Sequence, residues 1–265
     1  MAKLVDKLWN WGHLEGSHNN CTTLDCQMTP EQFASEYGIK NAFIVSYGGN
    51  ITPPFDNLAN RLSCLKEIKW SVLGDASTPL PDAKLGNTED IIDVLSSDAN
   101  ITGGVVDDFF SPKRMERFPP EILKKIKTRL NEKGLDFWCV LYDFQMDLEL
   151  EKYIECFDGV TFWLWDCEQI KNLDKHLDKV FALVKDKPLM FGVYLWDYQK
   201  GKGYYPMDPV LFETQLACYF ELLKNGKVDG VIVCSSTIGD ADLETNKILK
   251  RYVNEQGNID ISERY

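Results

Sequence analysis

Aspartates follow the apolar runs of this sequence at recurring points along the chain. In GGVVDDFF (103–110), two glycines and two valines lead directly into Asp107 and Asp108. If the runs are parallel strands of one barrel, the acids converge at its carboxyl-end mouth, where like charges repel unless they share a proton, a metal ion or a cation. A single aspartate there would usually cap a helix or begin a loop, but five runs in succession indicate a functional mouth. The acids that end the third to seventh runs are Asp75, Asp107 with Asp108, Asp143, Asp166 and Asp197.

Aromatic side chains stand beside these acids. The C–H groups of a sugar ring stack on aromatic faces while its hydroxyls bond carboxylates, so the combination favours a small-molecule saccharide as ligand. Besides Asp75, Asp143 and Asp197, the residues expected to contact it are Trp11, His13, Glu15, Tyr47, Tyr142, Trp165, Trp196 and Tyr198.

Cleavage of a glycosidic bond needs two carboxyl groups on opposite sides of that bond. Asp107 or Asp108 would serve as nucleophile or base and Asp166 as proton donor, because the fourth and sixth strands are close without being neighbours. A carboxyl separation near ~5.5 Å would predict retention of the anomeric configuration, and one above ~6.5 Å inversion. No cofactor is expected for this chemistry.

Two other functions stay open. His13, Glu15 and His18, with some of the aspartates, could hold a divalent metal that acts as a Lewis acid on a sugar, as in an isomerase or lyase. The barrel could also bind carbohydrate without catalysis. A nucleophilic serine or cysteine is less favoured, because there is no G-x-S-x-G motif and no obvious histidine base near Ser235 or Cys234.

Only one of the two adjacent aspartates can face the barrel interior if the strand stays regular through both, because successive side chains alternate between faces. We expect Asp108 to be the inward one, with the small residues Gly104 and Val106 on its face, and Asp107 to cap the next segment or support Asp108.

The elements that position these residues alternate strictly along the chain. Apolar runs predict strands at 4–12, 41–47, 68–74, 101–108, 135–143, 159–166, 188–197 and 229–236. Amphipathic segments predict helices at 29–38, 54–68, 88–97, 119–134, 147–157, 170–187, 208–226 and 243–257. Eight strand–helix units predict one (β/α)8 (TIM) barrel domain over residues 1–265 rather than a doubly wound sheet, which would show a glycine-rich first turn.

Composition narrows the class of partner and the compartment. The 265 residues carry a net charge of −12, which argues against a nucleic-acid partner. No apolar run approaches the roughly 20 residues that span a bilayer, so no membrane partner is expected, and the N-terminus as it stands has no signal-peptide apolar region. The eight cysteines are scattered, which favours a reducing compartment and hence the cytoplasm. The sequence predicts no particular oligomeric state.

At GGVVDDFF, TFWLWD (161–166) and GVYLWDY (192–198), the chain resembles glycoside-hydrolase-type (β/α)8 barrels. Retaining barrels of the alpha-galactosidase kind carry their acids on the fourth and sixth strands. The resemblance therefore implies catalytic roles for Asp107 or Asp108 and for Asp166. The chain departs from that pattern because no K-x-D precedes the fourth-strand acid. It also lacks the DxxDxDxE run of chitinase-like barrels and the Asn-Glu of cellulase-like ones.

Overall fold

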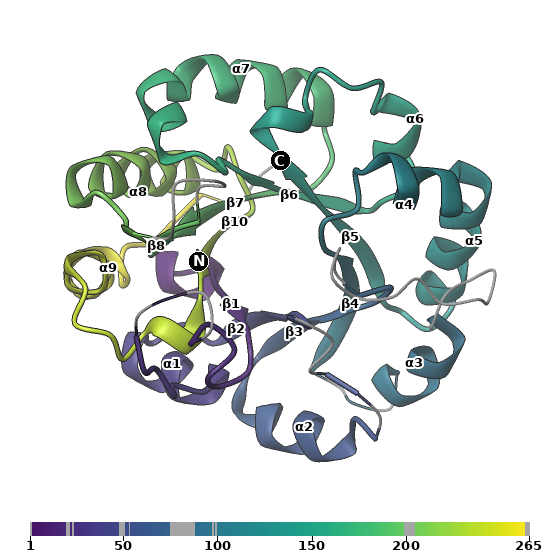
Figure 1. The fold of residues 1–265 in the computed structure, drawn as a ribbon, viewed down its shortest axis with the longest axis horizontal. Coiled ribbons are helices and arrows are strands. Elements are labelled where there is room, and N and C mark those ends of the chain that lie inside the picture. Colours follow the sequence, from purple (N-terminus) through teal and green to yellow (C-terminus); the bar gives the residue numbers. More distant parts are fainter. Residues whose placement is uncertain are drawn as a thin grey trace.

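The computed structural model describes residues 2–19, 22, 24–47, 51–52, 54–74, 88–96, 98, 100–198 and 205–262. Eight parallel strands close into a barrel in the order β1-β10-β7-β6-β5-β4-β3-β2, and helices surround it (Figure 1). The barrel strands are β1 (Leu8–Gly12), β2 (Asn41–Ile44), β3 (Glu67–Ser71), β4 (Ile101–Val106), β5 (Asp136–Tyr142), β6 (Gly159–Trp163), β7 (Leu189–Tyr194) and β10 (Gly230–Cys234). The predicted (β/α)8 barrel is confirmed.

All the α-helices except α4 fall within the predicted segments. The α-helices are α1 (Pro30–Tyr37), α2 (Asp56–Arg61), α3 (Thr88–Leu95), α4 (Pro112–Arg117), α5 (Pro120–Asn131), α6 (Glu151–Ile154), α7 (Leu173–Val184), α8 (Pro209–Lys224) and α9 (Glu244–Gln256). Short 3₁₀ turns are η1 (Leu4–Lys7), η2 (Leu62–Cys64), η3 (Asp143–Gln145), η4 (Cys167–Asn172) and η5 (Ser236–Ile238). None of the helices among the described residues is long and apolar enough to cross a membrane.

Three elements differ from the prediction. Residues 4–7, expected to begin the first strand, form η1 because the backbone N–H groups of Leu4 and Val5 bond to the carbonyls of Ile259 and Gly257 near the other end of the chain. Helix α4 precedes α5 and was not expected. Beyond β7, a two-stranded antiparallel sheet pairs β8 (Trp196–Asp197) with β9 (Tyr205–Pro206) outside the barrel.

Tryptophans fill the barrel interior, and glycines on neighbouring strands make room for them. A Cβ atom added to Gly159 would collide with the ring of Trp138, and one added to Gly192 would collide with Trp163. Trp11 meets Trp163 across the interior, with ring centroids 5.1 Å apart. The core of the barrel is therefore solid, as in other barrels of this type, and its chemistry must lie at an end.

Candidate active site

Asp107, not Asp108, continues the interior face of β4. A Cβ atom at Gly103 would collide with Asp136 inside the barrel, whereas one at Gly104 would contact Leu130 of α5 on the helix side. Gly103, Val105 and Asp107 thus share the inward face. The expectation that Gly104 and Val106 share an inward face with Asp108 is wrong, because the small residue that faces the interior is Gly103.

Asp108 nevertheless reaches the same phenol as Asp107, because the strand ends between them. Strand β4 stops at Val106, and Asp108 has a left-handed backbone with φ of 49°, a conformation that Asp and Asn tolerate better than most residues. The hydroxyl of Tyr142 donates to Oδ1 of Asp108 at 2.9 Å and lies 3.5 Å from Oδ1 of Asp107. The backbone N–H of Asp108 donates to Oδ1 of Asp107 at 2.8 Å. The turn therefore brings both carboxylates to one proton donor.

Two tyrosines, the buried Tyr142 and the partly buried Tyr194, keep their protons beside these acids. Burial raises the pKa of the Tyr142 phenol well above its usual value, and the charges of Asp107 and Asp108 raise it further. Burial likewise raises the pKa of Tyr194, at the end of β7, with added effects of Cys234 and the two aspartates. Both phenols are hence hydrogen-bond donors at neutral pH.

Aromatic rings extend from this pair around the mouth. The ring centroid of Trp165 lies 5.4 Å from that of Tyr142, 6.0 Å from Tyr194 and 6.3 Å from Tyr198. On the far side, Tyr198 meets His18 at 5.5 Å. Because His18 in turn stacks on Tyr47, four predicted residues line one connected aromatic wall: Tyr47, Tyr142, Trp165 and Tyr198. Tyr194 belongs to it as well and was missed, although alternation from Trp196 backwards would have placed it on the same face.

Two histidines complete the wall between β1 and β2. The rings of His13 and His18 lie 4.7 Å apart, and His18 stacks on Tyr47 at 5.1 Å. Nδ1 of His13 lies 3.0 Å from Oγ of Ser235, so the expectation that no histidine lies near Ser235 is wrong. Ser235 is fully buried, however, and its hydroxyl orients the imidazole of His13 rather than facing a substrate.

These histidines make folding stability depend on pH. Burial lowers the pKa of His18 from 6.5 to about 4. The pKa of His13 is lowered well below 6.5, first by burial and then by the charge of the neighbouring His18. As the pH falls, the histidines of the unfolded chain take up protons before those of the folded protein do. The contribution of these histidines to the unfolding free energy is therefore fully present above about pH 6.5 and declines toward pH 4.

We expect His18 alone to account for about 2 to 3 kcal/mol of unfolding free energy lost between pH 7 and pH 4.5. Urea unfolding of His18→Phe, which keeps a ring in the stack but cannot be protonated, should show a shallower decline than the parent. His176→Asn is the matched control, because His176 on α7 is partly exposed and contributes less. Parallel declines in the parent and His18→Phe would contradict this assignment.

Two predicted contact residues lie away from the mouth surface. Glu15 forms an ion pair with Arg61 at 3.1 Å, and Arg61 also pairs with Glu31 of α1, so this carboxylate is engaged outside the wall. Trp11 packs inside the barrel against Phe43 and Trp163.

The predicted acids that follow β5, β6 and β7 hold the rim together. Asp143 accepts a hydrogen bond from the backbone N–H of Trp165 at 2.9 Å. Asp166 is half-exposed and caps η4 by accepting from the N–H of Glu168 at 2.9 Å. Asp197 accepts from the Cys167 thiol at 3.3 Å, beside the buried Trp196. Asp75 lies outside the described residues.

The geometry separates Glu15 from the two histidines that could have shared a metal ion with it. Within the described ranges, no group of three or more His, Cys, Asp or Glu side chains is placed to hold a metal ion. His13 and His18 face each other in the wall, whereas the Glu15 carboxylate is paired with Arg61.

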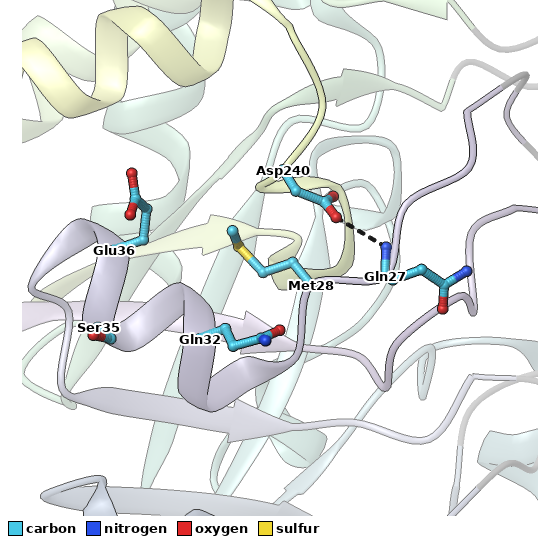
Figure 2. Close-up of a pocket in the computed structure, with 6 residues that line it drawn as sticks. All are labelled: Gln27, Met28, Gln32, Ser35, Glu36 and Asp240. Atoms are coloured by element: carbon cyan, nitrogen blue, oxygen red, sulfur yellow. Dashed lines mark hydrogen bonds between the residues drawn. The ribbon is translucent and has the colours of Figure 1, made fainter.

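A hollow of about 450 Å³ lies outside the barrel, beside α1 and the turn that follows β10 (Figure 2). Its acids have other partners: Asp240 accepts from the backbone N–H of Gln27 at 3.0 Å, and Glu36 pairs with Lys250 of α9. The hollow lacks the joined carboxylates and aromatic wall of the mouth, which we therefore take as the candidate active site.

The chain folds as the closed (β/α)8 barrel that its motifs implied, with acids and aromatic rings at the carboxyl-end mouth. No protein-family model matches the sequence, and no curated protein matches it. Similar solved structures include the spore cortex-lytic enzyme SleL of Bacillus megaterium QM B1551, with a TM-score of 0.58 and 14% identity over 98% of this chain and 75% of that one. The GH113 beta-mannanase AaManA of Alicyclobacillus acidocaldarius, in complex with ManMIm, has a TM-score of 0.55 and 12% identity. The match covers 96% of this chain and 98% of that one.

A third similar structure is a GH128 endo-beta-1,3-glucanase of Amycolatopsis mediterranei in complex with laminaritriose. It has a TM-score of 0.51 and 10% identity over 83% of this chain and 92% of that one. Likeness at such low identity shows the fold alone, so the function has to be argued from the site.

Proposed function

We propose that this protein hydrolyses a glycosidic bond in a saccharide bound at the barrel mouth. The observation that carries the proposal is the meeting of Asp107 and Asp108 at the Tyr142 hydroxyl, inside a wall of aromatic rings. Carboxylates supply the nucleophile, base and acid of this reaction, and aromatic faces hold the sugar ring. The complex of a barrel similar in fold with laminaritriose supports the same class of ligand.

The roles follow from position and exposure. Asp108 is the more exposed of the pair and would act as the nucleophile or base toward the anomeric carbon, while Asp107 is buried and holds the turn through the N–H of Asp108. Asp166 follows Trp165 at the end of β6 and would protonate the departing sugar oxygen. Asp108 follows β4 and Asp166 follows β6, with β5 between these two strands.

A double variant tests the proposal. The parent protein should cleave at least one member of a panel of aryl glycosides, β-1,4-mannan, chitin and β-1,3-glucan oligosaccharides, and Asp108→Asn/Asp166→Asn should cleave none of them. Asp147→Asn is the matched control, because this rim carboxylate is 90% exposed and its ion pair with Lys179 contributes little.

Undiminished turnover by the double variant would refute the assignment. Loss of parental activity in a chelator, with recovery on adding a divalent ion, would favour the metal-dependent enzyme instead. Saccharide binding without any turnover would indicate a binding barrel.

A further inference from the structure

Exposed aromatic rings of this protein gather at one end of the barrel. Among the residues that the structure describes, three aromatic side chains are largely exposed to solvent: Tyr47 (39% exposed), Phe144 (62%) and Tyr205 (58%). Tyr47 follows β2, Phe144 follows β5, and Tyr205 lies in β9 on the connection from β7 to α8. All three therefore stand on loops at the carboxyl ends of barrel strands, around the candidate active site.

Scattered exposed aromatics need no explanation, but two of these rings are held in place by buried ones. The ring of Phe144 lies nearly parallel to that of Tyr142, at 7° and 5.4 Å between centroids. Tyr142 is buried, so it covers one face of Phe144 and leaves the other to solvent. Tyr47 stacks in the same way on buried His18, at 27° and 5.1 Å. Such rings are flat, oriented platforms that lose little freedom when a ligand stacks on them.

The platforms are too far apart for a single sugar. Three steps around the barrel separate β2 from β5 (Figure 1), which is roughly 14 Å along the ring of strands at about 4.8 Å per step. Asp108 follows β4, between them, and Phe144 is joined to it through the Tyr142 ring that bonds its carboxylate.

We infer that the mouth binds an extended saccharide chain rather than a single sugar, with one unit stacked on Phe144 and a more distant one on Tyr47. The inference rests on the proposed function and specifies its substrate class as oligosaccharides or polysaccharides cleaved within the chain. Phe144 is then a specificity-determining residue. It increases the affinity for saccharides long enough to reach it and leaves the affinity for shorter ones unchanged.

Calorimetric binding of oligosaccharides of two to six units tests this inference separately from turnover. The ligands are β-1,4-linked mannose, β-1,4-linked N-acetylglucosamine and β-1,3-linked glucose, and Asp108→Asn serves as the background so that no ligand is cleaved. Affinity for at least one series should rise with chain length. Adding Phe144→Ala should lower affinity for the longest members about tenfold and for the disaccharide less than twofold.

Leu148→Ala provides the matched control, because Leu148 is an exposed apolar side chain in the connection that also carries Phe144, 47% exposed, and is not aromatic. It should leave every affinity within about twofold. Tyr47→Ala should repeat the length-dependent loss. Equal affinities in the Phe144→Ala and Leu148→Ala proteins, no gain in affinity from disaccharide to hexasaccharide, or no binding of any series would overturn the inference. If the parent protein binds long saccharide chains but cleaves none of them, the hydrolase proposal is refuted and the inference of an extended binding site is retained.

Discussion

We expect Asp108→Asn to lower turnover of the cleaved saccharide by about a thousandfold, because the proposed mechanism assigns this carboxylate the role of nucleophile or base. The substitution keeps the local backbone, since Asn tolerates the left-handed conformation of position 108 as well as Asp does. It also keeps an oxygen that can accept from the Tyr142 hydroxyl. Initial rates with saturating substrate, beside a thermal unfolding curve, separate lost chemistry from lost folding.

Variants of the two partners calibrate that result. The fold-loss of activity in Asp107→Asn should be at least about ten times smaller than that in Asp108→Asn. Asp107 is buried, and the substitution keeps the Oδ1 that accepts from the Asp108 N–H. Tyr142→Phe removes one hydrogen bond to a charged group and should cost about ten- to a hundredfold. A larger loss from Asp107→Asn than from Asp108→Asn would reverse the two roles, and full activity in both would show that the reaction does not take place at this pair.

Asp136→Asn lowers the unfolding free energy by about 3 kcal/mol, because it leaves the ammonium of Lys69 buried without its counter-charge. Nζ of Lys69 lies 2.6 Å from Oδ2 of Asp136 at the amino-end of the barrel, between the rings of Trp9 and Trp138 at 5.9 and 5.8 Å. The Lys69 side chain is 5% exposed, so little of it is in contact with water. Urea unfolding at neutral pH measures the loss.

The reverse substitution should be milder. Lys69→Met leaves the Asp136 carboxylate, whose side chain is 35% exposed and lines a hollow of about 150 Å³, and should cost about 1 kcal/mol. The double variant Lys69→Met/Asp136→Asn should match Lys69→Met, because no unpaired buried charge remains. A greater loss from Lys69→Met than from Asp136→Asn would mean that the carboxylate, not the ammonium, is the group that depends on the pair.

The barrel itself could be predicted because its signals are local. Each strand lies within a short apolar run, and the Thr29–Gln32 segment caps α1 as its residue types indicate, with Thr29 Oγ1 accepting from the N–H of Gln32 at 3.2 Å. The position of Trp11 was not predicted: it was expected to contact the saccharide but packs inside the barrel against Phe43 and Trp163. Several strands end about three residues earlier than predicted, and the first begins four residues later. Residues 4–7 form η1 instead, through hydrogen bonds to residues more than 250 positions away, which no local pattern records.

The candidate site could be predicted only in part, for a related reason. The sequence by itself determined which residue types reach the mouth, because the acids and aromatics stand where the strands end: Tyr47, Asp107, Asp108, Tyr142, Trp165 and Tyr198 are there. Period-two alternation says nothing once a strand has stopped, so only the tertiary structure decided that Asp107 and Asp108 both turn to Tyr142. It also drew Glu15 away to Arg61 and brought Ser235 to His13, 222 residues distant, because such partners are chosen by barrel closure and not by spacing along the chain.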